Sequence, residues 1–200
     1  MTARQRFDEA YYHRHYAGRS RVHSAREIAR LATGVTGLCD WLGVELSAVL
    51  DVGAGPGLWR DWFRRHRPRT RYRSTDVSPY ACGRYGHERR DISRWRSRER
   101  HDLIVCQGVL QYLDDAAAAR ALENLGAMAR GLLYLEAITA GDLAEVVDRE
   151  ATDLSIHART GAWYRRRLAP AFVQVGAGLW AARRASLPLY ELEAAPPRPA

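Results

Sequence analysis

Short apolar runs alternate along this chain with segments whose apolar residues recur every three or four positions. The runs at residues 48–52, 102–106 and 132–137 predict strands buried on both faces, and residues 71–76 predict a strand with a more polar face. Helical spacing lies before, between and after these strands, at residues 24–42, 58–66, 114–130 and 160–168. Buried strands separated by helices predict a parallel sheet with helices on both faces.

The helix over residues 24–42 has the clearest boundaries. Ser24 and Glu27 have the spacing of a capping box, in which the two side chains satisfy free backbone N–H groups of the first turn. Gly43 follows the last turn, where glycine commonly ends a helix. The apolar side chains between these signals fall on one face, namely Ile28, Leu31, Val35, Leu38, Cys39 and Leu42.

The end of the chain has a different pattern. In residues 172–180 every second side chain is apolar, as in a strand with one buried face. Residues 187–193 form a second strand-like segment after a short connection. Because strands joined so closely cannot be parallel neighbours, the two segments predict a hairpin. The predicted fold class is therefore α/β, with a mostly parallel sheet that carries an antiparallel hairpin at one edge.

Length and composition indicate one domain. The chain has 200 residues, of which 46% are hydrophobic, and this is enough to bury a sizeable core. No repeat or linker divides the sequence. We expect a single domain over residues 1–193, which includes an N-terminal helical cap segment over residues 1–44. Residues 194–200, rich in proline and alanine, predict a disordered tail.

The chain carries a formal net charge of +8, and every one of its basic residues is arginine. The runs over residues 60–73 and 90–100 mix arginine with aromatic residues. This mixture is found on nucleic-acid-binding surfaces and also on the solvated faces of amphipathic helices, and both interpretations stay open.

The cysteines and the start of the chain indicate a cellular compartment. Three cysteines without a short paired spacing are typical of reduced thiols in a cytosolic protein. Cys82 and His87 are too few ligands for a metal site, so we expect no metal. The first residues lack an apolar signal core and no apolar run approaches membrane length. We expect a soluble, cytoplasmic protein that does not act at a membrane.

The strand over residues 48–52 leads into three closely spaced glycines, Gly53, Gly55 and Gly57. Ligands of open parallel sheets bind at such strand ends. A dinucleotide loop has the spacing G-x-G-x-x-G, whereas these glycines follow G-x-G-x-G, and no G-K-[ST] follows. Asp51 comes two residues earlier, where a carboxylate repels pyrophosphate but suits a ligand that carries an ammonium and a sulfonium.

Further polar residues follow the next strands. Asp76 ends the strand over residues 71–76, where an acidic residue can accept from both ribose hydroxyls. Asp91 and Ile92 come 15 residues later, and this pair can accept from an adenine amine while the ring packs on the isoleucine. Gln107 follows the strand over residues 102–106.

The segments "LDVGAGPG", "STDVS", "RRDIS" and "DLIVCQGVLQYLDD" occur in this order between residues 45 and 137. With this spacing they resemble the successive motifs of class I S-adenosylmethionine-dependent methyltransferases, in particular those acting on small molecules. The resemblance implies a Rossmann-like, seven-stranded sheet and S-adenosylmethionine as cofactor. It also implies transfer of a methyl group, by in-line displacement, to an O, N or C atom of a small-molecule acceptor.

The resemblance also implies roles for residues of the first two motifs. Asp51 and the backbone of Gly53, Ala54 and Gly55 would line the methionine part of the cofactor. Asp76 would hold the ribose hydroxyls.

The later motifs supply the remaining cofactor contacts that the resemblance implies. Val77 would pack beside the adenine, and Asp91 and Ile92 would hold its edge. The backbone near Gln107 would receive the cofactor's ammonium group.

Residues 7–16 are rich in aromatic side chains. Many members of the family have a tyrosine-bearing segment that folds over the cofactor's carboxylate, and Tyr16 is a candidate for that contact. An amphipathic helix that packs its aromatic residues on the domain explains the same pattern. The other candidates in the segment are Tyr11, Tyr12 and His15.

The acceptor site is expected at the ends of the later strands. Gln111 and Tyr112 follow the fourth strand, and Glu136 and Thr139 follow the fifth. We predict Glu136 and His157 as the catalytic residues. His157 is a candidate base because an imidazole titrates near working pH, although such residues also serve in packing. An acidic acceptor, or alternatively solvent, would be contacted by Arg159, Tyr164 and Arg165.

Other functions stay open at the level of the sequence. The arginine runs suit an RNA or protein methyltransferase, and the lack of an evident base suits a non-catalytic protein that binds the cofactor. A nucleotide-dependent oxidoreductase is disfavoured by Asp51 and by the glycine spacing. Methylation of DNA adenine is disfavoured because "CQGV" replaces the [DN]-P-P-[FY] turn that clamps a planar amine. A small-molecule acceptor and a monomer or homodimer are the predicted partners.

Overall fold

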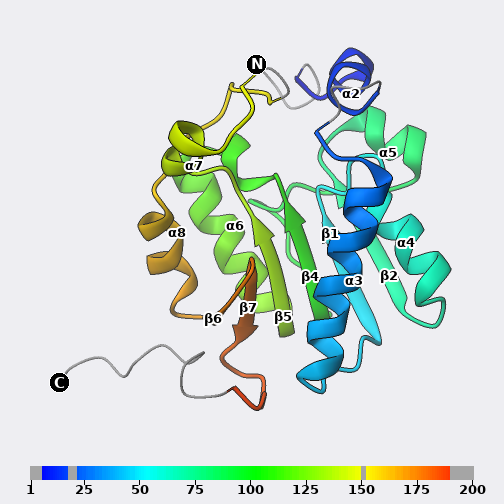
Figure 1. The fold of residues 1–200 in the computed structure, drawn as a ribbon, viewed down its shortest axis with the longest axis vertical. Coiled ribbons are helices and arrows are strands. Elements are labelled where there is room, and N and C mark those ends of the chain that lie inside the picture. The colour runs from blue at the N-terminus through cyan, green and yellow to red at the C-terminus, as the bar shows by residue number, and fades with distance from the viewer. Residues whose placement is uncertain (1–5, 18–21, 150–151, 190–200) are drawn as a thin grey trace.

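A computed structural model describes residues 6–17, 22–149 and 152–189, and it contains one seven-stranded sheet with helices on both faces (Figure 1). The spatial strand order is β3-β2-β1-β4-β5-β7-β6. The strands are β1 (Ala48–Val52), β2 (Arg71–Asp76), β3 (Glu88–Arg89), β4 (His101–Gln107), β5 (Ala129–Glu136), β6 (Phe172–Gly176) and β7 (Leu179–Ala182). This architecture confirms the predicted Rossmann-like α/β fold.

Strand direction explains where a ligand can bind. β1 pairs in parallel with β2 and β4, and the parallel pairing continues to β3 on one side and to β5 on the other. β7 is antiparallel to both β5 and β6. The chain order reverses between β1 and β4, so the loops that leave these two strands diverge and open a crevice at their carboxyl ends.

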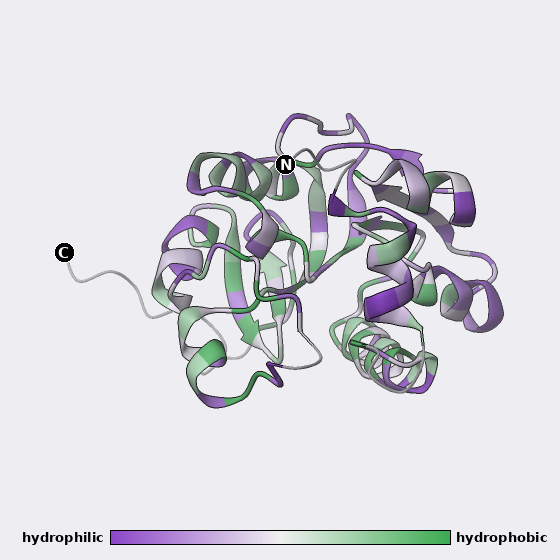
Figure 2. Ribbon diagram, turned by 90° about the horizontal axis from the view of Figure 1, so that it is seen from above, coloured by the Kyte–Doolittle hydropathy of each residue, from purple (hydrophilic) through white to green (hydrophobic). Residues whose placement is uncertain are grey.

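Two apolar layers hold the helices on the sheet. On one face, α3 (Ala25–Trp41) and α4 (Leu58–His66) pack around Val49, Leu103 and Leu132. On the other face, α6 (Asp115–Met128) and α8 (Gly161–Leu168) pack around Leu50 and neighbouring strand residues. Successive strand residues alternate between these layers, which is why the buried strands read as continuous apolar runs. Figure 2, in which the ribbon is coloured by hydropathy, shows from above that the sheet lies between the helices of its two faces.

The remaining helical segments lie at the carboxyl edge of the sheet or beside it. α2 (Glu9–Tyr16) crosses this edge above β1 in Figure 1. The short helix η1 (Leu110–Tyr112) follows β4, and α7 (Ala140–Glu145) follows β5. α5 (Pro79–Tyr85) follows β2. No helix of the described residues is long and apolar enough to cross a membrane.

The predicted capping box of α3 is confirmed. Ser24 Oγ accepts from the Glu27 N–H, and the Glu27 carboxylate accepts from the Ser24 N–H. The buried face of α3 differs from the prediction at Leu38, which is 39% exposed.

The hairpin is present, but its predicted boundaries are wrong. Its strands are β6 and β7, so the chain turns inside the segment 172–180 and residues 187–189 form no strand. The turn is Gly176-Ala177-Gly178, and all three residues have positive φ angles. Glycines permit this conformation, which ends a strand that the alternating pattern alone would continue. Residues 190–193 and the predicted tail over residues 194–200 lie outside the described residues.

Candidate functional site

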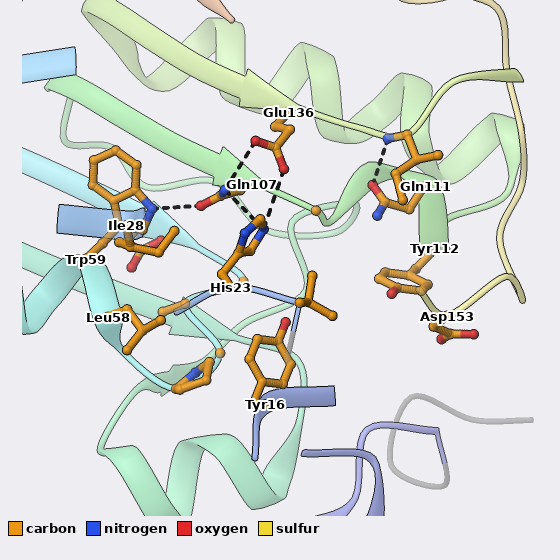
Figure 3. Close-up of a pocket in the computed structure, with 18 of the residues that line it drawn as sticks. Tyr16, His23, Ile28, Leu58, Trp59, Gln107, Gln111, Tyr112, Glu136 and Asp153 are labelled. Atoms are coloured by element: carbon orange, nitrogen blue, oxygen red, sulfur yellow. Dashed lines mark hydrogen bonds and ion pairs between the residues drawn. The ribbon is translucent and has the colours of Figure 1, made fainter. Parts of the chain in front are cut away.

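Two adjoining cavities open at the carboxyl ends of β1, β2, β4 and β5, with volumes of about 250 and 220 Å³. The first cavity is lined towards β5 by Glu136 and Gln111 (Figure 3). The second extends towards β2 and is lined by Asp76 and Asp91. Both cavities are lined by Tyr11, Tyr16, Gly53, Gly55, Gln107, Gly108 and Tyr112.

The glycine loop forms the floor on which the two cavities meet. Gly53 and Gly55 have φ angles of 71° and 55°, which glycine adopts without strain. A Cβ atom at Gly53 would lie 2.3 Å from Val109 Cγ2, so this position accepts no side chain without a shift. The Gly53 and Ala54 N–H groups donate to the Thr75 carbonyl at 2.8 and 3.0 Å, which ties the loop to β2.

Asp51 lies under this loop and is 2% exposed. Its Oδ2 accepts a hydrogen bond of 2.7 Å from the Tyr72 hydroxyl. Burial raises the pKa of Asp51 to about 7, although the hydrogen bond from Tyr72 opposes this shift. The group therefore titrates near neutral pH, and a cation above it would favour the ionised form.

Asp76 is held at the end of β2 by two backbone donors. Its Oδ2 accepts from the Gly55 N–H at 3.0 Å and its Oδ1 accepts from the Ser78 N–H at 2.8 Å. Burial raises its pKa, and these donors oppose the shift. His87 holds the same loop from the other side, because its Nε2 lies 2.9 Å from the Gly55 carbonyl oxygen and its Nδ1 lies 2.8 Å from Ser74 Oγ.

The predicted adenine residues line the second cavity together. Asp91 accepts from the N–H and the hydroxyl of Ser93 through Oδ1, at 2.9 and 2.7 Å. Oδ2 is 3.7 Å from Arg94 Nε. Ile92 is 4% exposed, and it lines this cavity with Val77. The cavity thus combines apolar side chains with a carboxylate.

A polar network closes the first cavity at the ends of β4 and β5 (Figure 3). The Trp59 indole N–H donates to Gln107 Oε1 at 2.9 Å, and Gln107 Nε2 donates to Glu136 Oε2 at 3.2 Å. Tyr134 donates to the same Glu136 oxygen at 2.9 Å. His23 Nε2 lies 3.3 Å from Gln107 Nε2 and 3.7 Å from Glu136 Oε1.

The residues of this network that sequence reasoning missed are His23, Trp59 and Tyr134. His23 directly precedes Ser24, the N-cap of α3, and the capping box of that helix fixes its position. Its two partners, Gln107 and Glu136, follow 84 and 113 positions later. No local pattern marks such a residue.

The N-terminal segment spans both cavities. The hydroxyls of Tyr11 and Tyr112 are 3.0 Å apart, and Ser78 Oγ donates to the Phe7 carbonyl. Arg6 reaches the opposite side, where it lies 3.2 Å from Asp153 Oδ2. Tyr16 lines both cavities, and burial raises its pKa.

Several predicted acceptor residues lie elsewhere. His157 is exposed and lines neither cavity, and Thr139 caps α7 by accepting from the Asp142 N–H. Arg159 is 5% exposed, so it does not face a ligand or solvent as predicted. It is held by Asp115, at 2.7 Å, and by the carbonyls of Leu110 and Leu113. Tyr164 belongs to the apolar core, and Arg165 is exposed. Gln111 and Tyr112 do line the first cavity.

One protein family and several solved structures, all of methyltransferases, are similar to this chain. Residues 38–175 match a family described as methyltransferase domain. The structure resembles an O-methyltransferase family protein from Burkholderia thailandensis with a TM-score of 0.56 and 14% identity, over 81% of this chain and 58% of that one. No curated protein matches the sequence.

Two further solved structures contain S-adenosylhomocysteine (SAH). The plantazolicin methyltransferase BpumL, in complex with a pentazolic desmethylPZN analog and SAH, gives a TM-score of 0.60 at 15% identity, over 74% of this chain and 64% of that one. The N-methyltransferase NodS from Bradyrhizobium japonicum WM9 gives a TM-score of 0.54 at 21% identity, over 79% of this chain and 87% of that one. This chain spans about 58% to 64% of the length of the first two relatives, and the likeness shows the fold alone.

Proposed function

This chain belongs to the methyltransferase-domain family, and from that premise we propose that it transfers a methyl group from S-adenosylmethionine to a small-molecule acceptor. One observation carries the proposal. Two cavities meet over a glycine loop, with Asp76 and Asp91 at one end and Asp51 and Glu136 at the other.

The residues present fit the proposed cofactor. Beyond its chain neighbours, no atom of the described residues lies closer than 3.9 Å to a Cβ built on Gly55, and this open surface allows a ligand to lie against the backbone. Asp76 has fixed carboxylate oxygens at the mouth of the second cavity, where they suit the two ribose hydroxyls. Asp91 presents Oδ2 beside the buried Ile92, which suits the amine and the ring of adenine.

The first cavity suits the methionine part. Asp51 lines it, and a carboxylate there attracts the sulfonium and ammonium charges. The cofactor supplies an activated methyl group with a good, neutral leaving group. The protein then contributes mainly position, because it holds the acceptor in line with the methyl group and keeps water out.

Tyr16 and its neighbours on α2 support the exclusion of water. The segment lies over both cavities and is bound at its N-terminal end, through Phe7 to Ser78 and through Arg6 to Asp153. We propose that it covers the cofactor during the reaction.

The acceptor is proposed to be small because the first cavity measures about 250 Å³. RNA or protein acceptors would have to present a small group into this cavity, and the arginine-rich exterior is the one feature that favours them. A cytoplasmic location, which the cysteine content favours, and a monomeric or homodimeric state belong to the same proposal.

Replacement of Asp76 tests the cofactor assignment. The Asp76→Ala variant should bind S-adenosylmethionine and SAH more weakly by about 1–3 kcal/mol, because it removes the proposed hydrogen bonds to the ribose. Titration calorimetry measures this loss. Asp40→Ala is the control, since Asp40 pairs with Arg67 on the surface and lines neither cavity. An Asp76→Ala variant that is folded and keeps wild-type affinity would refute the ribose contact.

A further inference from the structure

The first cavity is acidic in a chain of positive net charge, and this contrast identifies a class of acceptor. We propose that the acceptor is an amine, bound as its ammonium ion by Glu136, and that His23 takes the proton which the ammonium must lose before the nitrogen is methylated. The inference rests on the proposed function, because it assigns the acceptor of the same site.

Glu136 has one oxygen fixed and one oxygen available. Oε2 accepts from the Tyr134 hydroxyl at 2.9 Å and from Gln107 Nε2 at 3.2 Å. Within the described residues, the only contact of Oε1 is His23 Nε2 at 3.7 Å. The side chain is 42% exposed and lines the first cavity. Two neutral donors thus orient the carboxylate and leave Oε1 free to accept from a ligand.

The other charges of the first cavity favour a cation. Its described lining contains the carboxylates of Asp51, Glu136 and Asp153 and no arginine. Asp153 is paired with Arg6, and Asp51 accepts from Tyr72 beneath the glycine loop. Asp51 faces the position proposed for the cationic methionine part of the cofactor, so Glu136 is the carboxylate of this cavity that is left to bind a cationic acceptor. Such a lining attracts an ammonium and repels an acceptor that is itself a carboxylate or phosphate.

The hydrogen bonds of Gln107 define the state of His23. The indole N–H of Trp59 can only donate, so Gln107 Oε1 faces it and the amide nitrogen faces His23. An amide nitrogen only donates, and His23 Nε2 therefore accepts, which means that it carries a lone pair. Nε2 itself lies 3.7 Å from Glu136 Oε1, and this carboxylate stabilises a proton that arrives on the nitrogen.

The reaction balances with these two residues. The ammonium nitrogen bound at Glu136 gives one proton to His23 Nε2 and becomes a neutral amine. Its lone pair then forms a bond to the methyl carbon while the carbon–sulfur bond breaks, and that electron pair returns to sulfur. The products are an N-methylated ammonium ion, SAH and a protonated His23, which releases its proton to solvent.

Other titratable groups surround His23 and belong to any pH profile of the site. Glu136 on β5 is the nearest carboxylate. The same cavity is lined by Tyr11, Tyr16, Asp51, Tyr112 and Asp153.

Binding of matched probes tests the role of Glu136. Benzylamine and benzyl alcohol are titrated into the protein saturated with SAH. We expect the wild type to bind benzylamine at least about tenfold more tightly than the alcohol, and Glu136→Gln to abolish this preference while its affinity for SAH is unchanged. Glu123→Gln is the control, since Glu123 is exposed on α6 and lines neither cavity.

Methyl transfer to matched amines tests the role of His23. Benzylamine is protonated at neutral pH, whereas aniline is not. His23→Gln should lower the rate of methyl transfer to benzylamine at pH 7 at least about tenfold and leave the rate with aniline near that of the wild type. The rate of the variant with benzylamine should recover as the pH approaches the pKa of that amine. His66→Gln, which changes an exposed imidazole at the end of α4, is the control.

The possible results separate this inference from the proposed function. Failure of the wild type to bind SAH would refute the proposed function and the inference with it. If SAH binds, the inference is overturned by equal affinity for the two benzyl probes, by a preference that survives in Glu136→Gln, or by absence of transfer to either amine. Loss of transfer in His157→Gln but not in His23→Gln would assign the base to the residue predicted from sequence.

Discussion

At the residue scale, the site was predictable where a side chain follows a strand directly. Asp51 and Asp76 were predicted because they lie at the carboxyl ends of predicted strands, and Asp91 was predicted from its position 15 residues after Asp76; each lines one of the two cavities. His23 was not predictable, since its position depends on contacts with β4 and β5. The burial of Arg159 could not be predicted either, because an arginine in a basic sequence is normally exposed.

The raised pKa of Asp51 predicts a dependence of stability on pH. Burial raises its pKa from about 3.8 to about 7, so between these values the folded protein holds a proton that the unfolded chain has lost. The contribution of Asp51 to the free energy of unfolding therefore falls as the pH rises from about 4 to about 7. An asparagine at this position does not titrate, so the stability of Asp51→Asn relative to the wild type should increase as the pH rises from about 4 to about 7.

Urea denaturation of both proteins at several pH values measures the effect. Parallel stability curves for the wild type and Asp51→Asn would show that the carboxyl group does not titrate in this range.

The close approach of Gly53 to Val109 predicts that a side chain at position 53 lowers the stability of the fold. Gly53→Ala places a Cβ atom 2.3 Å from Val109 Cγ2 at a φ of +71° and should destabilise the fold by about 1–3 kcal/mol. Gly34→Ala is the matched control, because nothing lies within 4 Å of its added Cβ on α3. We expect that control to be more stable than the wild type by about 0.5–1 kcal/mol. Equal stability of the two variants in denaturant would contradict the packing described for the loop.

At the element scale, helices and buried strands were predicted closely and short edge elements were not. β1, β2 and α4 have the predicted bounds, since caps and apolar spacing are local signals. β3 is two exposed residues paired with β2, which is too short to leave a pattern. The hairpin was misplaced because alternation continues through the turn Gly176-Ala177-Gly178, where backbone conformation rather than hydropathy ends the strand.

The contacts of Arg159 predict how the loop after β4 is held. Its guanidinium donates to the carbonyl of Leu110 in η1, to the carbonyl of Leu113 directly after η1, and to Asp115 at the start of α6. Arg159→Ala leaves these acceptors without their donor and should destabilise the protein by about 2–4 kcal/mol. Arg166→Ala, an exposed change on α8, should stay within about 0.5 kcal/mol of the wild type. Similar denaturation midpoints for both variants would rule out this role.

At the scale of the whole molecule, one sheet edge gathers the site. The reversal of strand order between β1 and β4 opens the crevice, and the motifs at the strand ends predicted its position. The position of α2 over the crevice could not be predicted from the sequence, because the contacts from Phe7 to Ser78 and from Arg6 to Asp153 join segments 71 and 147 positions apart. The family match over residues 38–175 begins after α2.

Titration calorimetry of the wild-type protein shows whether the site binds S-adenosylmethionine. S-adenosylmethionine, SAH and NADH are titrated separately under the same conditions. The site described predicts micromolar binding of the first two ligands and none of NADH, because Asp51 and the glycine spacing oppose a pyrophosphate. Tight binding of NADH, or no binding of either S-adenosyl ligand, would contradict the account.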